Sequence, residues 1–249
     1  DMLSLVQEKL AERGYMALFS FWKTVEGIEK AFESIFLHNV DGIIAWDYHE
    51  CLAREKIPAV IYGAEIPGFD AVMQDYAFSS KTTVKYLLKL GHVEIGYLGP
   101  LEDPRAEFLR QNLEEARLPV REEWFIPAKG TLPGGNDAMP EFLSLKKRPT
   151  ALVAQNDSIA AGAMFCAIRS GIRIPEDLSV IGFNNTVTAA FTLPPLTTFN
   201  THTNDLADAL VDLLMKRLET PDMPVQVSKI RPELVIRESC KSITEKEVK

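Results

Sequence analysis

The residues that could carry out chemistry in this sequence favour binding over catalysis. No GxSxG, HExxH or GxxxxGKS/T motif occurs, and no GxGxxG motif stands at a strand-to-helix turn. The four histidines lack the spacing of metal ligands. Glu102, Asp103 and Glu107 resemble an acid pair, but they fall in the first turn of an expected helix, where negative charge complements the helix dipole. The sequence therefore predicts capping for these carboxylates, and no catalytic residue, metal or cofactor.

Polar side chains that follow the apolar runs form a second group. In an open parallel α/β sheet, ligands bind outside the carboxyl ends of the strands, where the loops converge. Amides and a guanidinium pair with hydroxyl groups, and an aromatic ring packs on the apolar face of a sugar, so this group suits a neutral or weakly anionic polyhydroxylated ligand. Its members are Trp46 and Asp47, Gly63, the stretch 100–105 ending at Arg105, the stretch 155–158 with Asn156 and Asp157, and Asn184 with Asn185.

Each of these residues also has a purely structural interpretation. Arg105 could lie on an exposed helix surface, and either Asn156 or Asp157 could cap the helix that follows. Asn184 could be a turn residue that tolerates a left-handed backbone, and Trp46 could belong to the core. The spacing alone leaves these alternatives open.

Alternating apolar runs and helical stretches must position these loops. Strands separated by crossover helices imply parallel sheets with both faces covered. Two lobes are expected, because one core rarely grows to about 250–300 residues. Strands are expected at 15–21, 41–46, 58–63, 72–75, 94–99, 124–126, 150–155, 178–183, 195–200, 224–227 and 232–237. Helices are expected at 1–13, 25–38, 51–56, 79–92, 102–117, 137–145, 158–170 and 205–218.

Composition narrows the class of protein. The chain has 249 residues with 27 Lys+Arg and 35 Asp+Glu, a formal charge of −8 that disfavours direct binding of nucleic acid. No stretch approaches the roughly 18 consecutive apolar residues of a membrane span, so we expect no membrane partner. Cys51, Cys166 and Cys240 are odd in number and widely spaced, which predicts a reducing compartment and hence a cytoplasmic protein.

The run RPTALVAQNDSIAAGAMFCAIRSGIRIPEDLSVIGFNNTVTAAFTLPPLTTFN, residues 148–200, resembles the lactose/galactose repressor (LacI/GalR) family of bacterial transcription regulators. The resemblance extends back through YLLKLGHVEIGYLGPLEDPRAEF and VDGII, and forward to PELVIRES. It implies an α/β fold with two Rossmann-like lobes and parallel sheets, of the periplasmic-binding-protein type I architecture, that bind a small effector between them. The three crossovers are expected near 75–78, 198–201 and 225–234. The N-terminal lobe would comprise 1–75 and 199–225, the C-terminal lobe 76–198 and 226–240, and the tail 241–249.

The same resemblance assigns roles to particular residues. Arg105 stands where the family has its effector-binding arginine, and AQND matches its AND motif. Asn184 replaces the first Asp of the usual GFDD, and Gly63 stands where many members carry Asp. With Arg105 retained, these two exchanges predict a less negative pocket, suited to an acidic or acceptor-rich sugar or to a larger one. The implied effector-binding residues are Trp46 as a stacking ring, Gly63, Arg105, Asn156, Asp157, Asn184 and Thr201.

The resemblance further implies the effector-sensing and dimerisation region of a DNA-binding transcriptional regulator, a repressor. Its partners would be a carbohydrate effector, a second copy in a homodimer, and operator DNA held only through a helix-turn-helix head. That head and the first core strand would precede Asp1, so we expect the natural chain to supply both. The alternative is a periplasmic sugar-binding protein of a transport system. An enzyme acting on sugars is disfavoured because no paired base and nucleophile can be found.

Overall fold

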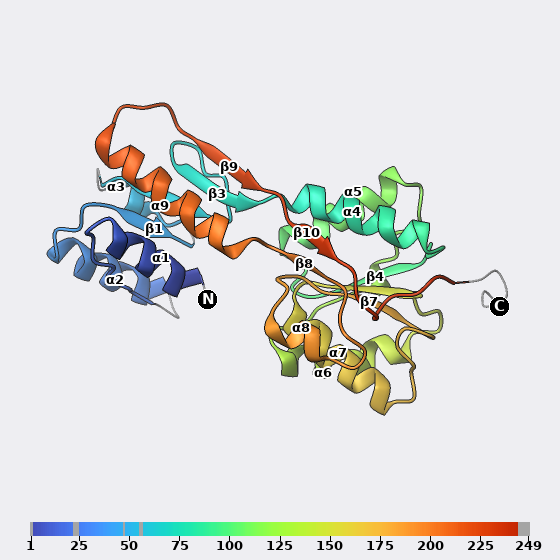
Figure 1. Cartoon of the computed structure of the whole chain (residues 1–249). Coiled ribbons are helices and arrows are strands. Elements are labelled where there is room, and N and C mark those ends of the chain that lie inside the picture. Colours follow the sequence, from blue (N-terminus) through green and yellow to red (C-terminus); the bar gives the residue numbers. More distant parts are fainter. Residues whose placement is uncertain (1, 22–24, 47, 55–56, 244–249) are drawn as a thin grey trace. The chain divides into compact units, whose positions relative to one another are not determined.

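The chain folds into two compact units, each built on a parallel sheet (Figure 1). The computed structural model describes residues 2–21, 25–46, 48–54 and 57–243. Unit 1 comprises residues 1–74 and 202–230, and unit 2 comprises residues 75–201 and 231–249. The chain therefore crosses between the units three times, at 74/75, 201/202 and 230/231. The predicted α/β class with two lobes and three crossovers is confirmed.

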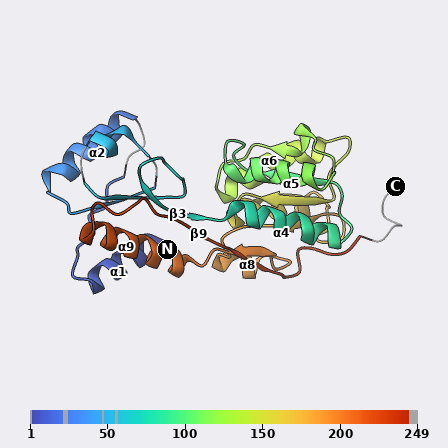
Figure 2. The same cartoon turned by 90° about the horizontal axis from the view of Figure 1, so that it is seen from above.

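The sheet of unit 1 has the order β1-β2-β3-β9, and all its neighbours are parallel. Its strands are β1 (Ile43–Ala45), β2 (Ala59–Tyr62), β3 (Asp70–Gln74) and β9 (Val227–Ile230). Figure 2 shows α1 (Met2–Glu12) beside α9 (Thr203–Glu219) on one face, and α2 (Val25–Leu37) on the other face, to which α3 (Glu50–Arg54) also contributes. Burial of both faces explains why β1 and β2 are short apolar runs without alternation, whereas the edge strand β9 alternates between exposed and half-buried residues.

The sheet of unit 2 has the order β5-β4-β6-β7, again with parallel neighbours. Its strands are β4 (Ile95–Leu98), β5 (Phe125–Ile126), β6 (Ala151–Ala154) and β7 (Ser179–Ile181). One core cluster packs under α4 (Tyr76–Lys89) and α5 (Pro104–Glu115), and another packs under α6 (Leu132–Ser144) and α7 (Asp157–Arg169). The remaining elements are η1 (Glu122–Trp124), α8 (Val187–Phe191), and the antiparallel pair β8 (Thr198–Asn200) and β10 (Glu233–Val235).

Side-chain caps start α4, α5, α6 and α7 of unit 2, that of α6 being Thr131. Asp75 accepts a hydrogen bond from the backbone N–H of Phe78, and Asp103 accepts one from that of Arg105, each at 2.9 Å. Asn156 accepts from the N–H of Ile159 at 2.8 Å. Capping of α5 by Asp103 was predicted, and so was capping of α7 by one of the residues 156 and 157. The caps of α5 and α7 fix the first turn of each helix near the carboxyl end of the strand that precedes it.

Helix α6 begins five residues earlier than expected. Its first turns contain Gly134 and Gly135, which disfavour a helix locally. A Cβ atom at Gly135 would lie 2.1 Å from the carbonyl oxygen of Ile159, and one at Gly162 would lie 1.9 Å from that of Leu132. The glycines therefore let α6 and α7 approach closely, and this tertiary packing overrides the local preference.

The prediction of a strand at 15–21 is wrong, because this segment forms no strand. The backbone N–H of Tyr15 donates to the carbonyl of Leu10, which continues the end of α1. Met16 is 95% exposed and Phe21 is 77% exposed. A strand needs a neighbour to complete its hydrogen bonds, and none of the described strands lies beside this segment.

Pairing of strands places the unit boundaries a few residues from the expected ones. β8 belongs to unit 2 because it pairs with β10, so the return into unit 1 comes after Thr201. β9 belongs to unit 1 because it lies parallel to β3. Of the expected tail 241–249, Lys241 donates to Ser179 and Ile243 donates to the carbonyl of Leu90, both in unit 2, and residues 244–249 lie outside the described part.

None of the helices in the described ranges is long and apolar enough to cross a membrane.

Candidate functional site

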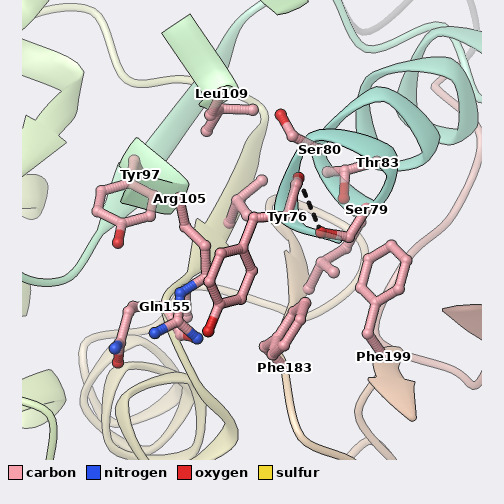
Figure 3. A pocket seen from close by; sticks show the side chains of 14 residues that line it. Tyr76, Ser79, Ser80, Thr83, Tyr97, Arg105, Leu109, Gln155, Phe183 and Phe199 are labelled. Carbon is pink, nitrogen blue, oxygen red and sulfur yellow. Dashed lines mark hydrogen bonds between the residues drawn. The ribbon is translucent and has the colours of Figure 1, made fainter. Parts of the chain in front are cut away.

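The carboxyl ends of the strands in unit 2 bring together Arg105, Asn156 and Asn184. Arg105 lies in the first turn of α5 after β4, Asn156 follows β6, and Asn184 follows β7. A cavity of about 30 Å³, room for a water-sized group, lies beside Arg105. Figure 3 shows the side chains that surround it, among them Tyr76, Arg105, Gln155 and Phe183. The site that we describe is this cavity together with the strand ends around it.

Arg105 is held by an ion pair that the sequence analysis missed. Its Nε donates to Oδ1 of Asp103 at 2.8 Å, and its Nη2 donates to Oδ2 at 2.7 Å. Its Nη1 donates to the backbone carbonyl of Gln155 at 2.9 Å. The side chains of Arg105 and Asp103 are only 18% and 15% exposed. The exposed helix-surface alternative for Arg105 is therefore wrong.

Two aromatic rings flank the guanidinium (Figure 3). Its central carbon lies 4.9 Å from the ring centroid of Tyr76 and 5.2 Å from that of Phe183. The two ring centroids are 5.9 Å apart. Burial raises the pKa of Tyr76, with Arg105 lowering it and Asp103 raising it, so the phenol stays protonated and able to donate.

The ion pair changes the charge expected for the site. Burial alone would raise the pKa of Asp103, but the hydrogen bonds and charge of Arg105 outweigh burial and lower it. Burial alone would lower the pKa of Arg105, but its hydrogen bond and charge interaction with Asp103 outweigh that effect and raise it. Both groups are therefore charged at neutral pH, and they neutralise each other. Arg105 therefore adds no net positive charge to the site, and the acidic, acceptor-rich or larger sugar expected from the exchanges at Asn184 and Gly63 stays a prediction.

Asn156 and Asp157 are engaged within the protein. Besides capping α7, Asn156 donates through Nδ2 to Oε1 of Gln155 at 2.7 Å and to the carbonyl of Gly130 at 3.2 Å. Asp157 is fully buried, and its two carboxylate oxygens accept hydrogen bonds from Thr186 and Thr198. Burial raises the pKa of Asp157, while these hydrogen bonds lower it. A direct contact with an effector would require Asp157 to break bonds that it already makes.

Asn184 is the exposed member of the group. Its φ is 102°, and its backbone N–H donates to the carbonyl of Phe199. The neighbouring Asn185 has a φ of 50° and accepts from Nη2 of Arg237 at 2.6 Å. Both asparagines therefore have the left-handed backbone that the turn alternative predicted, and the amide of Asn184 faces solvent.

Trp46 and Gly63 lie at the corresponding edge of unit 1. Trp46 follows β1, is 38% exposed, and has its ring centroid 5.5 Å from that of Tyr62. Gly63 follows β2 with a φ of 89°, and its N–H donates to the carbonyl of Val72. Thr201 is buried, and it is the last residue of the segment 75–201 of unit 2. Asp47 lies outside the described residues.

The sequence analysis missed the aromatic part of the site. Tyr76 is the first residue of α4, and Phe183 directly follows Gly182 at the end of β7. The signal that could have found Phe183 is its position immediately before Asn184. Tyr76 reaches the site because α4 packs beside α5, the helix that carries Arg105. No local sequence pattern predicts this contact. Within the described part of the chain, no three His, Cys, Asp or Glu side chains gather as metal ligands.

Comparison with known proteins agrees with this architecture. A family model described as a periplasmic binding protein-like domain matches residues 84–240, more than half of the chain. The HTH-type transcriptional repressor PurR of Pasteurella multocida is 31% identical over 258 residues, covering 97% of this chain and 77% of the repressor. Among solved structures, a LacI-type transcriptional regulator of Bacillus cereus subsp. cytotoxis has a TM-score of 0.91 at 22% identity, covering 98% of this chain and 92% of that one. The transcriptional regulator CelR in complex with cellobiose has a TM-score of 0.87 at 22% identity, covering 96% of this chain and 77% of that one.

The chain belongs to the periplasmic binding protein-like domain family. Within that family it is the effector-binding region of a LacI-type transcriptional regulator. The relatives named above are regulators rather than enzymes, and they favour this function over the transport alternative.

Proposed function

We propose that this region binds a small polyhydroxylated effector, a carbohydrate, at the strand ends around Arg105, and that binding controls a repressor. The observation that carries the proposal is Arg105 itself, flanked by two aromatic rings with part of its donor set unused. Hydroxyl groups accept from a guanidinium, and a sugar ring offers an apolar face to aromatic side chains. The CelR complex with cellobiose supports this ligand class.

The proposed contact residues differ in how many of their polar atoms are free to bind a ligand. Arg105 and Asn184 have polar atoms open to a ligand, so they are the contacts that we test. Asn156 and Asp157 act mainly by holding the loop. Trp46, Gly63 and Thr201 remain predictions from the family resemblance.

Regulation would follow from a shift between conformations. An effector that binds one conformation better than another shifts the population toward it, and only differential affinity can do so. We propose that a homodimer transmits this shift to operator DNA through a DNA-binding head, in the cytoplasm, without any chemical step catalysed by this chain. The repressor relatives support this assignment.

A ligand screen tests the proposed effector class. Thermal unfolding of the purified chain is measured with neutral mono- and disaccharides, uronic acids and sugar phosphates, and each compound that stabilises the protein is then titrated by calorimetry. A bound ligand raises the melting temperature by mass action. We expect at least one carbohydrate to bind, and Arg105→Gln to weaken it about tenfold or more, since a hydrogen bond to a charged group is worth about 1.5–3 kcal/mol.

Arg173→Gln is the matched control, because Arg173 forms an equivalent but exposed pair with Asp177. Binding that is equal in wild type, Arg105→Gln and Arg173→Gln would place the site elsewhere. Absence of binding by every carbohydrate, with binding of another class of small molecule, would refute the carbohydrate assignment.

A further inference from the structure

We propose that Asp103 determines the charge selectivity of the effector site: it neutralises Arg105, so the site accepts uncharged hydroxyl-bearing ligands and rejects carboxylates and phosphates. This inference rests on the proposed function, which places the effector at Arg105. It narrows the effector class to neutral polyols.

The carboxylate of Asp103 is saturated with hydrogen bonds. Oδ1 accepts from the backbone N–H and the Nε of Arg105, at 2.9 and 2.8 Å. Oδ2 accepts from Nη2 of Arg105 at 2.7 Å and from Nε2 of Gln155 at 3.0 Å. A carboxylate offers about four acceptor positions, so all of them are used. Asp103 is therefore held in place from two directions, by the first turn of α5 and by the loop after β6.

The guanidinium keeps only part of its binding capacity. Arginine has five N–H groups in a planar fork. The edge formed by Nε and Nη2 is taken by Asp103, and Nη1 donates to the carbonyl of Gln155. Two N–H groups are left for a ligand. The side-on edge by which arginine grips a carboxylate or phosphate at two points is thus already occupied by a carboxylate of the protein.

An anionic ligand would meet an unfavourable charge. It would have to displace Asp103, which leaves a partly buried carboxylate unpaired, or bind beside it as a like charge. A hydroxyl group needs neither change, because it can accept from the remaining N–H groups. The pair of Arg173 and Asp177 has the same two-point geometry but is 70% and 34% exposed, so solvent screens it and it lies outside the cavity lining.

Asp103→Asn separates the charge from the structural role. Asparagine also caps helices well, so α5 should keep its first turn. Asp177→Asn is the matched control, since it removes the same charge from another two-point arginine–aspartate pair of unit 2. Asp103→Ser, a second neutral cap, is used if the asparagine variant does not fold. Far-UV circular dichroism and thermal unfolding verify that each variant is folded.

The probe is inorganic phosphate, titrated by calorimetry at low ionic strength into the wild-type chain and each variant. We expect Asp103→Asn to bind phosphate about tenfold or more tightly than wild type, which corresponds to about 1.4 kcal/mol. Asp177→Asn should behave like wild type, and Asp103→Asn combined with Arg105→Gln should lose the gain. A gain that persists in the double variant, or no gain in either Asp103 variant, would overturn the proposal.

The outcome is separable from that of the proposed function. Phosphate reports on the charge at Arg105 whether or not a sugar binds, so a phosphate gain without any carbohydrate binding would refute the effector class and leave the role of Asp103 standing. Tight binding of uronic acids or sugar phosphates by the wild-type chain at Arg105 would refute the role of Asp103 instead.

Discussion

The hydroxyl of Thr198 donates to Oδ1 of the fully buried Asp157 at 2.5 Å, and this bond joins the start of α7 to β8. Oδ2 of the same carboxylate accepts from the backbone N–H and the hydroxyl of Thr186, at 2.6 and 3.0 Å. Asp157 thus ties three segments of unit 2 together at the edge that carries Asn184. We therefore expect its chief contribution to be to the shape of the site.

Asp157→Ala should lower the free energy of unfolding by about 2–4 kcal/mol, because it leaves three buried or half-buried donors without their acceptor. Urea denaturation measures this change. Asp157→Asn should cost less, since one amide oxygen can still accept. An alanine variant of unchanged stability that fails to bind effector would instead make Asp157 a ligand contact.

Asn184→Gly should weaken effector binding without loss of stability. Glycine removes the amide yet readily adopts the φ of 102° at this position, whereas alanine would add backbone strain. We expect affinity to fall about tenfold, as measured by calorimetry with a carbohydrate identified in the screen. Gly63, which follows β2 in unit 1, already has a positive φ, as Asn184 does, so a glycine is compatible with the backbone at both positions. Unchanged affinity in Asn184→Gly would remove Asn184 from the site.

His92 should make unit 2 sensitive to acid. Its ring is buried, with Nε2 3.0 Å from the carbonyl oxygen of Lys241 and Nδ1 2.9 Å from the hydroxyl of Thr150. A carbonyl only accepts, so Nε2 carries the hydrogen. Burial lowers the pKa of His92 below its ordinary 6.5, although the bond to Lys241 raises it.

The sign of this effect follows from proton linkage. Between the lowered pKa of the folded state and the ordinary value of the unfolded state, the unfolded chain binds more protons. The contribution of His92 is therefore fully present above about pH 6.5 and is lost as the pH falls, by at most about 1.4 kcal/mol per pH unit. Urea denaturation from pH 7.5 to 5 should show a shallower loss in His92→Gln. His38→Gln, at an exposed histidine, is the control, and equal slopes in all three proteins would contradict the prediction.

The proposed homodimer should depend on an apolar surface of unit 2. Val187 and Phe191 of α8 and the following Leu193 are 79%, 82% and 83% exposed, and α8 packs beside α7, where Phe165 is 54% exposed. Several large exposed apolar side chains on neighbouring helices are typical of an interaction surface. Phe191→Asp should raise the dimer dissociation constant tenfold or more, about the worth of one buried aromatic side chain, as measured by sedimentation.

Val93→Asp is the control for the dimer prediction, since Val93 is 45% exposed in the turn between α4 and β4. Equal self-association of wild type and Phe191→Asp would show that this surface is not the interface. Loss of the dimer in Val93→Asp alone would move the interface to that turn.

The sequence by itself determined most of the elements and the family. Local apolar runs predicted the strands of the two parallel sheets to within a few residues, because burial on both faces requires such runs. The edge strand β9 is not such a run, and it shares only Val227 with the expected strand at 224–227. The caps at Asp103 and Asn156 follow from short-range chemistry, and so does the left-handed turn at Asn184. The strand at 15–21 failed because the apolar pattern does not reveal whether a neighbouring strand is present to pair with it.

Only the tertiary structure decided what the site residues are free to do. Arg105 and Asp103 are only two residues apart in the sequence. The residues that pack against this ion pair, Gln155 and Phe183, lie 50 and 78 positions along the chain from Arg105. The sequence offers Asp157 as a ligand contact, and only the tertiary structure places Thr186 and Thr198 on its oxygens. Hydrogen-bond satisfaction and burial depend on segments distant in sequence, and these two properties set which charge a ligand meets.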